Sequence, residues 1–112
     1  MINKFLSFLG LARKAGKLSL GADPTIESIK GRKAKLILLC EDLSVKSNQN
    51  IISLSCKYKI ETKNIPICMD QIKQSIGKRV GIIAINDSGF ANKIKILLDS
   101  VDRRTSIYDD EI

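Results

Sequence analysis

The sequence has no histidine, no tryptophan and few aromatic side chains or prolines in its 112 residues. Histidine is the most frequent general base and metal ligand in proteins, so its absence argues against acid–base or metal-dependent catalysis. The three cysteines (Cys40, Cys56 and Cys68) are too far apart for a zinc motif or a disulfide framework. We therefore expect buried, reduced thiols in a cytoplasmic protein, with no catalytic residue, no metal and no cofactor.

A long apolar run is also missing, since no segment approaches the roughly 20 residues of a membrane span. The apolar N-terminal stretch is short, runs directly into Arg13 and Lys14 and lacks a small-residue cleavage site, which argues against a signal peptide. The length suits a single domain with its own core. We expect this domain to cover residues 1–100, followed by a disordered acidic tail over residues 101–112 that shows no apolar period. Neither a membrane nor DNA is an expected partner.

Aromatic residues make up 4 % of the chain, which bears on the kind of nucleic acid it could bind. Domains that read single strands stack bases on exposed aromatic rings. The helical pattern places Phe5, Phe8 and Phe90 on core faces. That leaves Tyr58 and Tyr108, and the second of these stands among acidic residues that repel a polyanion. The shape and phosphates of a structured RNA are therefore the better match.

Positive charge is what the chain has in excess. The net charge is +7, and because residues 101–112 carry two arginines and four acids, residues 1–100 carry +9. Between positions 10 and 35 there are seven cations and two acids. Such a concentration favours a polyanionic partner over a merely solvated face.

The stretch "GLARKAGKLSLG", which starts at position 10, superficially resembles a phosphate-binding loop. Such a loop needs four residues between its glycines and a hydroxyl after the lysine, whereas here five residues intervene and Leu18 follows Lys17. Apolar residues recur at helical spacing over residues 2–15, so a helix precedes the glycine turn where a phosphate-binding loop has a strand. We therefore interpret the stretch as the end of a helix, a turn at Gly16 and a short strand.

Helical and strand-like segments alternate along the rest of the chain. Continuous apolar runs over residues 34–40 and 80–86 predict two central strands that are buried on both faces. Residues 18–20 and the weakly alternating residues 59–64 predict two edge strands. The predicted helices cover residues 2–15, 24–30, 45–58 and 69–76, and a last helix starts at residue 88. The expected fold class is α/β, a three-layer α-β-α sandwich around a small mixed sheet of about four strands.

Three loops, which we expect at one end of the sandwich, are the candidate RNA contacts. The first leads into the second helix, where Asp23 is the expected N-cap and Pro24 the first helical residue. The second is the basic turn at residues 30–33. The third is the loop at residues 77–81, in which glycines permit close approach and Val80 offers an apolar contact, although a tight connection with solvated charges explains it equally well. The candidate RNA-binding residues are Gly21, Ala22, Asp23, Lys30, Arg32, Lys33, Lys78, Arg79, Val80 and Gly81, with Arg13, Lys14 and Lys17 as a secondary basic patch.

The motifs "LGLARKAGKLSLG", "KAKLILLCED", "IGK" and "INDSGFA", in this order, resemble those of the bacterial YlxQ-like branch of the ribosomal protein L-seven-Ae/L-thirty-e superfamily. The resemblance implies a three-layer α-β-α fold, no catalysis, and binding of kink-turn RNA, a sharply bent internal loop with sheared G·A pairs. It implies RNA contacts from the start of the second helix and the loop before the last strand, with ribosomal or other kink-turn RNA as partner. Gly21 fits the family pattern and Asp23 can replace its Asn or Glu. However, Pro24 stands in place of a glutamate and Glu27 in place of a lysine.

Two other functions stay open on the sequence alone. A protein-interaction adaptor on the same fold, with decayed RNA binding, is favoured by Pro24, Glu27 and the acidic tail but opposed by the positive charge of residues 1–100. A small Mg²⁺-dependent enzyme would use Glu41, Asp42 and Asp87, yet these acids are better explained as helix caps and first-turn residues. The expected function is therefore non-catalytic binding of structured RNA.

Overall fold

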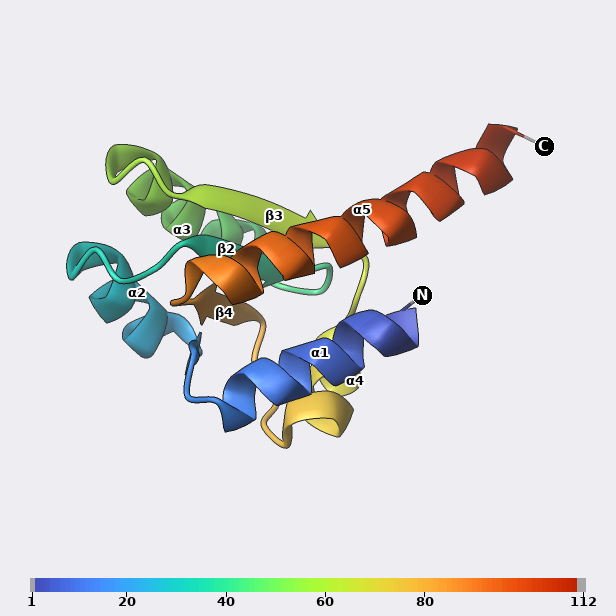
Figure 1. Cartoon of the computed structure of the whole chain (residues 1–112). Helices are drawn as coiled ribbons and strands as arrows, with labels where there is room; N and C mark the ends of the chain where they lie inside the picture. The colour runs from blue at the N-terminus through green and yellow to red at the C-terminus, as the bar shows by residue number, and fades with distance from the viewer. Residues whose placement is uncertain (1, 111–112) are drawn as a thin grey trace.

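The computed structural model describes residues 2–110, with side chains described up to residue 100. Helices and strands alternate along the chain (Figure 1). The elements are α1 (Ile2–Lys14), β1 (Leu18–Leu20), α2 (Ala22–Lys30), β2 (Leu36–Cys40), α3 (Val45–Lys57), β3 (Glu61–Ile65), α4 (Met69–Ile76), β4 (Ile82–Ile85) and α5 (Ser88–Asp110). The disordered tail expected over residues 101–112 stays a prediction, because its side chains, and residues 111–112 altogether, lie outside the described part.

The strands form one mixed sheet in the order β1-β4-β2-β3. β2 and β3 run parallel, whereas β4 is antiparallel to both β1 and β2. Every residue of β2 and β4 is buried, as their continuous apolar runs predicted, and β1 and β3 form the edges. One row across the sheet contains Leu18, Ile85, Leu36 and Glu61, and it marks the end at which β4 finishes.

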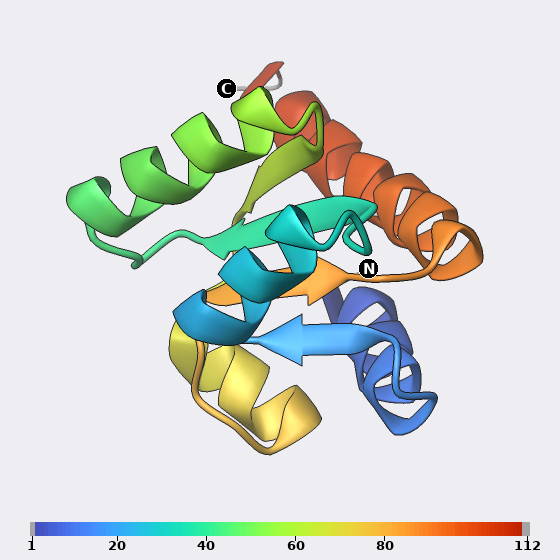
Figure 2. The same ribbon diagram turned by 90° about the vertical axis from the view of Figure 1, so that its left-hand side faces the viewer.

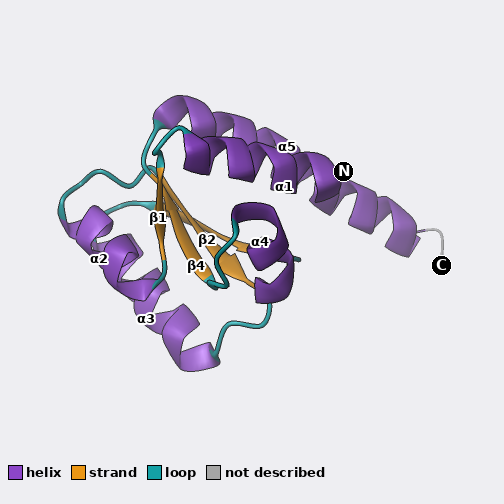
Figure 3. Ribbon diagram, turned by 90° about the horizontal axis from the view of Figure 1, so that it is seen from below, coloured by secondary structure: helices purple, strands orange, loops and turns teal. Residues whose placement is uncertain are grey.

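Helices cover both faces of the sheet, which confirms the predicted three-layer α-β-α sandwich (Figure 3). Helices α1, α4 and α5 pack on one face, and α2 and α3 pack on the other. Alternate residues of β2 supply the two layers, as the two-residue period of a strand requires. Leu36 and Leu38 belong to the core under α1, α4 and α5, and Ile37 and Leu39 belong to the core under α2 and α3. No helix among the described residues is both long and apolar enough to cross a membrane.

Helix α2 begins earlier than the sequence suggested, so the prediction of Asp23 as its N-cap is wrong. Gly21 is the N-cap, with φ of 93° and ψ of 174°, and no side chain caps the helix. Because the backbone at Gly21 turns from β1 directly into the helix, Asp23 already lies in the first helical turn. Pro24 is the third helical residue, where the N–H that proline lacks would have no partner within the helix.

Three other helix ends follow the signals in the sequence. The side chain of Ser44 accepts a hydrogen bond from the backbone of Ser47 over 3.2 Å at the start of α3. At the start of α5, a carboxylate oxygen of Asp87 accepts one from the backbone of Phe90 over 2.9 Å. Helix α4 ends at Gly77, whose φ of 82° is left-handed. Asp87 therefore has a structural role as a helix cap.

The cysteines differ in exposure. Cys40 is buried at the end of β2 and Cys68 is half-buried before α4, whereas Cys56 is exposed on α3. The expectation that all three thiols are buried is therefore wrong for Cys56. Cys56 lies on the outward face of α3, whereas Ile51 and Ser55 lie on the opposite, buried face of the same helix.

Candidate nucleic-acid interface

Two of the three candidate loops lie side by side. β1 ends beside the first residue of β4, where the backbone N–H of Gly21 donates a hydrogen bond to the carbonyl of Ile82 over 2.8 Å. A Cβ added at Gly21 would lie 3.9 Å from Cγ1 of Val80, so the start of α2 contacts the loop before β4. We call this region, residues 20–24, 41–42 and 77–81, the helix-start end.

The amino end of α2 is open to a ligand. No side chain caps the helix, and Ala22, Asp23 and Pro24 are exposed. The first backbone bond of the helix joins the N–H of Thr25 to the carbonyl of Gly21, so the earlier amides have no partner within the helix. With the helix dipole, these amides favour an anion or another hydrogen-bond acceptor, and the Asp23 carboxylate beside them adds an acceptor of its own.

The loop at residues 77–81 presents two exposed cations, one of which is already paired. Nε of Arg79 donates a hydrogen bond to Oδ1 of Asp70 over 2.9 Å, and this bond raises the pKa of the guanidinium. Lys78 has no such contact among the ion pairs of the described residues. Exposed ion pairs contribute little to stability, so the guanidinium can exchange Asp70 for another anion at low cost.

Val80 and Gly81 serve the packing of this loop. Val80 is 7 % exposed and belongs to the core under α1, α4 and α5, so its side chain is not an exposed apolar contact. A Cβ added at Gly81 would lie 3.0 Å from Cδ1 of Leu43 and 3.2 Å from Cε of Met69. Glycine at this position therefore admits neighbouring side chains of the protein itself.

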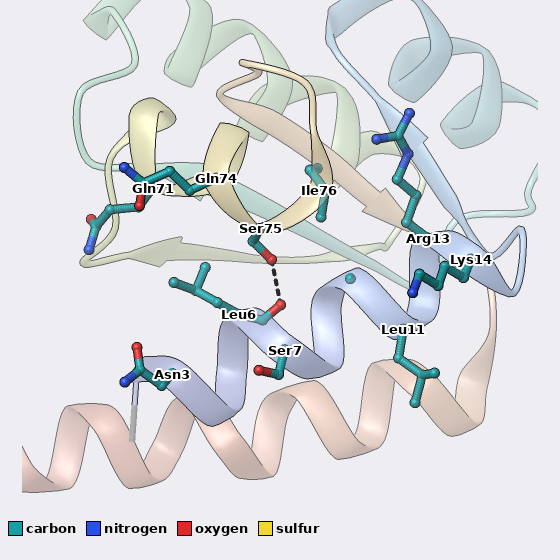
Figure 4. Close-up of a pocket in the computed structure, with 11 residues that line it drawn as sticks. Asn3, Leu6, Ser7, Leu11, Arg13, Lys14, Gln71, Gln74, Ser75 and Ile76 are labelled. Atoms are coloured by element: carbon teal, nitrogen blue, oxygen red, sulfur yellow. Dashed lines mark hydrogen bonds between the residues drawn. The ribbon is translucent and has the colours of Figure 1, made fainter.

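The residues of the secondary basic patch are all exposed and follow one another where α1 ends, and their role in RNA binding stays a prediction. Arg13 and Lys14 line a groove of about 760 Å³ between α1 and α4, whose walls also carry two glutamines, two serines and an asparagine (Figure 4). Nη1 of Arg13 lies 3.2 Å from the position that a Cβ on Gly77 would take, so Arg13 reaches the start of the loop before β4. Lys17 stays close to the end of α1, because its backbone N–H donates a hydrogen bond to the carbonyl of Ala12 over 3.0 Å. The carbonyl of Lys17 accepts a hydrogen bond from the backbone N–H of Asn86 over 2.8 Å, which also ties it to the end of β4.

The basic turn at residues 30–33 lies at the opposite end of the sheet from Gly21 (Figure 2). The expectation that all three loops share one end of the sandwich is therefore wrong. β4 begins beside Gly21 but ends at Ile85, whose carbonyl accepts a hydrogen bond from the backbone N–H of Lys35 over 2.7 Å. Helix α2 carries the chain between these two points, over roughly 13 Å at 1.5 Å per residue.

Charge is distributed unequally between the two ends. The helix-start end carries Lys78 and Arg79 near the carboxylates of Asp23, Glu41, Asp42 and Asp70. The opposite end, which we call the basic end, carries Lys17, Lys30, Arg32, Lys33, Lys35 and Lys59, with Glu61 and Asp87 as its acids. Glu61 is paired with Lys63 at 3.5 Å and Lys95 at 3.2 Å. Among the described residues, no cluster of three or more acids, cysteines or histidines is arranged to hold a metal ion.

Three residues of the basic end were not selected from the sequence: Lys35, Tyr58 and Lys59. The parallel pairing of β2 with β3 aligns Leu36 with Glu61, and it thereby brings the residues before both strands together. This pairing joins segments far apart in the chain, so neither segment predicts the other. The one local signal was a cation shortly before each strand.

Comparisons with known proteins agree with this architecture. The chain matches the model of the ribosomal protein L7Ae/L30e/S12e/Gadd45 family over residues 3–94. It is 36 % identical over 97 residues to the RNA-binding protein YlxQ of Bacillus subtilis, which covers 86 % of this chain and 96 % of that protein. It is 33 % identical over 96 residues to the RNA-binding protein YlxQ of Enterococcus faecium, covering 86 % of this chain and 92 % of that protein.

Solved structures show the same fold. A protein with unknown function from Bacillus halodurans C superposes with a TM-score of 0.79 and 27 % identity, covering 86 % of this chain and 97 % of that one. The Giardia lamblia 15.5kD RNA binding protein superposes with a TM-score of 0.70 at 11 % identity, covering 88 % and 84 %. At that identity the second likeness shows the fold alone. The chain thus belongs to the ribosomal protein L7Ae/L30e/S12e/Gadd45 family and is a YlxQ-like member of it.

Proposed function

We propose that the protein is a non-catalytic RNA-binding protein that recognises structured, kink-turn-like RNA at the helix-start end. The observation that carries the proposal is the 2.8 Å backbone hydrogen bond from the N–H of Gly21 to the carbonyl of Ile82, which joins the start of α2 to the end of the loop before β4. These are the two segments from which the family resemblance expects RNA contacts. The names of the two YlxQ relatives, both described as RNA-binding proteins, support the same class of partner.

The surface offers suitable chemistry for a bent RNA. The open amides at the amino end of α2 can donate to acceptors on a guanine edge or a phosphate. The Asp23 carboxylate can accept from the amino group of a guanine. Lys78, which is exposed, and Arg13, which reaches Gly77, can contact the RNA backbone, and Arg79 can leave Asp70 for a phosphate.

Two residues weaken this surface. Glu27 is exposed one helical turn beyond Asp23, so its charge opposes a nearby phosphate. Pro24 removes a backbone donor from the first turn of α2. Recognition therefore depends on the fit of the bent RNA to the two loops more than on attraction between opposite charges.

The excess of carboxylates at the helix-start end supports a second candidate function. Three acids (Asp23, Glu41 and Asp42) accompany two cations there, and one of these cations is already paired with Asp70, a balance that suits a basic protein surface better than RNA. On this alternative the protein is an adaptor whose partner binds where related proteins bind RNA. The two functions differ in one measurable respect, because an adaptor has no preference for a kinked RNA over a plain duplex.

The test is a titration of a labelled kink-turn RNA and of a duplex of the same length without the internal loop, followed by fluorescence anisotropy. We expect the kink-turn RNA to bind more tightly. Glu27→Lys should tighten that binding by roughly 1–2 kcal/mol, because a repulsive charge is exchanged for a charge-assisted contact. Asp99→Lys, an equal change of charge at an exposed position of α5, is the matched control and should have a much smaller effect. Equal affinity for the two RNAs in the wild type and in Glu27→Lys would favour the adaptor.

A further inference from the structure

The basic end contains a shallow hollow of about 290 Å³ between the turn that follows α2 and the turn that follows α3. It is lined by Arg32, Ala34, Lys35, Tyr58, Lys59 and Ile60. Three of these six residues are cations and none is an acid, so the hollow differs from an ordinary solvated face with mixed charges. Cations that share one concave site repel each other unless an anion occupies it.

The framework of the sheet positions two of these cations. The backbone N–H of Lys35 bonds to the carbonyl of Ile85 over 2.7 Å, which ties it to the end of β4. The backbone N–H of Lys59 bonds to the carbonyl of Cys56 over 3.0 Å, in the turn that closes α3. Because β2 and β3 are neighbouring parallel strands with Leu36 opposite Glu61, the two segments that carry Lys35 and Lys59 enter the sheet about 5 Å apart.

Arg32 is held over an aromatic ring. Its guanidinium carbon lies 5.3 Å from the centroid of the Tyr58 ring, within the range of a cation–π contact. Tyr58 follows the last residue of α3, is half-buried against the core under α2 and α3, and lines the hollow. This contact holds a flexible cation at the site and leaves the guanidinium N–H groups available to an anion.

Backbone conformation provides an independent observation. Among the described residues, the two that are not glycine and have positive φ are Arg32 and Lys59, each at 59°. Glycine or asparagine takes this conformation with less strain than a long side chain does. Both strained positions carry a cation and both line the hollow. Because a strained backbone conformation occurs at two cationic residues of the same site, it indicates that their positive charge has a functional role.

Side-chain hydrogen bonds fix the second half of α2, the helix that precedes the turn with Arg32. The side chain of Ser28 in α2 donates a hydrogen bond to Oδ1 of Asn86 over 2.5 Å, and Nδ2 of Asn86 donates to the side chain of Ser19 over 2.9 Å. These bonds lock the second half of α2 to the end of β4 and to β1. The turn that carries Arg32 therefore leaves a fixed helix, as a preformed site requires.

We propose that this hollow binds a backbone phosphate of RNA, with Arg32, Lys35 and Lys59 as its ligands and the Tyr58 ring against the adjoining nucleotide. The site lies at the opposite end of the sheet from the helix-start end, so one protein molecule holds two separate segments of RNA. The inference rests on RNA as the partner but not on kink-turn recognition. Phosphate contacts carry no sequence information, so the hollow adds affinity without specificity.

The first experiment uses two labelled RNAs, a plain hairpin and the same hairpin with a kink-turn in its stem. Lys35→Gln/Lys59→Gln should weaken binding of both RNAs by about tenfold and reduce the slope of log K against log salt by about two. Lys4→Gln/Lys93→Gln removes the same charge from exposed positions on α1 and α5 and should change affinity less than twofold. Equal losses in the two double variants would overturn the proposal in favour of a general effect of net charge.

A second variant separates binding from folding. Lys59→Gly removes the charge and relieves the left-handed strain, so its melting temperature should be no lower than that of the wild type while RNA affinity falls. Wild-type affinity in this variant and in Arg32→Gly would overturn the proposal. Amide NMR shifts of Lys35 and Lys59 should move on addition of the plain hairpin. Saturable shifts with inorganic phosphate alone, below millimolar concentration, would instead assign the hollow to a free phosphate.

The outcomes distinguish this site from the proposed function. If the wild type shows no preference for the kink-turn hairpin but Lys35→Gln/Lys59→Gln weakens both RNAs, the hollow stands and recognition at the helix-start end fails. If the wild type prefers the kink-turn hairpin but Lys35→Gln/Lys59→Gln binds RNA as well as Lys4→Gln/Lys93→Gln does, only the proposal for the hollow is overturned. Absence of binding to either RNA overturns both.

Discussion

At the scale of single residues, Gly21 links the fold to the candidate site. Its φ of 93° and ψ of 174° fall in a region that is almost restricted to glycine. A side chain at this position would not clash with its neighbours, because an added Cβ would lie 3.9 Å from Cγ1 of Val80. The strain of a substitution would therefore fall on the backbone, where β1 turns into α2.

We expect Gly21→Ala to lower the free energy of unfolding by about 1–3 kcal/mol and to reduce the preference for kink-turn RNA, because the strain displaces the start of α2. Urea denaturation and RNA titration measure the two effects. Gly16→Ala is the control, since Gly16 has a φ of 73° in open space at the end of α1. It should cost about 1–2 kcal/mol and leave the preference unchanged. A similar loss of preference in both variants would contradict the role given to Gly21.

The thiols provide a second test at this scale. Burial, reinforced by the nearby Asp42, raises the pKa of Cys40 from 9.0 to about 12, whereas Cys56 is exposed. Because the thiolate is the reactive form, a chromogenic thiol reagent at pH 8 should modify Cys56 quickly and Cys40 only after unfolding. Cys56→Ser should remove the fast phase. A fast phase that persists in this variant would show that another thiol is accessible in the folded protein.

At the scale of elements, α2 and α3 begin in different ways. Ser44 caps α3 through its side chain, whereas Gly21 starts α2 without a side-chain cap and Asp23 lies in the first turn. Asp23 therefore stabilises α2 through the helix dipole alone. The difference matters for the site, since an uncapped helix start keeps its amides free for RNA.

We expect Ser44→Ala to lower the free energy of unfolding by about 1 kcal/mol and Asp23→Ala by less, about 0.3–0.5 kcal/mol. Asp23→Ala should nevertheless weaken kink-turn binding, because it removes an acceptor at the site, while Ser44→Ala should not. Chemical denaturation and anisotropy titrations on the same preparations separate the effects. Equal destabilisation by the two substitutions would show that Asp23 caps α2 after all.

Most elements could be predicted from local patterns. The apolar runs that form β2 and β4, the serine that caps α3 and the glycine that ends α4 each act within a few residues of their position. The start of α2 could not be predicted as reliably. Asp23 followed by Pro24 is a strong local signal, but the pairing of β1 with β4 places Gly21 at the turn and begins the helix there.

At the scale of the whole molecule, positive charge gathers away from the helix-start end. The six cations of the basic end face few free acids, whereas the helix-start end has more carboxylates than cations. An RNA that contacts both ends would be attracted electrostatically at the basic end and recognised by its shape at the helix-start end. Attraction to phosphates is weakened by salt, but shape recognition is not.

We therefore expect affinity for folded RNA to fall as salt rises, with a log–log slope of roughly −3.5 to −4.5 that corresponds to about four or five phosphates. Poly-U should compete poorly, because the chain has few exposed rings on which unpaired bases could stack. Titrations from low to physiological salt, with and without poly-U, test both statements. Competition by poly-U as strong as that of the folded RNA would exclude recognition by shape.

The order of helices and strands, the buried central strands, the excess of positive charge and the family could all be inferred from the amino-acid sequence. These features depend on the local period, on turn residues and on motifs that can be read along the chain. Which loops lie side by side depends on how the strands pair, and the sequence does not show this. Strand order β1-β4-β2-β3 brings Gly21 to Val80 at one end and places Arg32 over Tyr58 at the other. Those contacts join residues far apart in sequence, and their free energy comes from pairing and packing that no local pattern encodes.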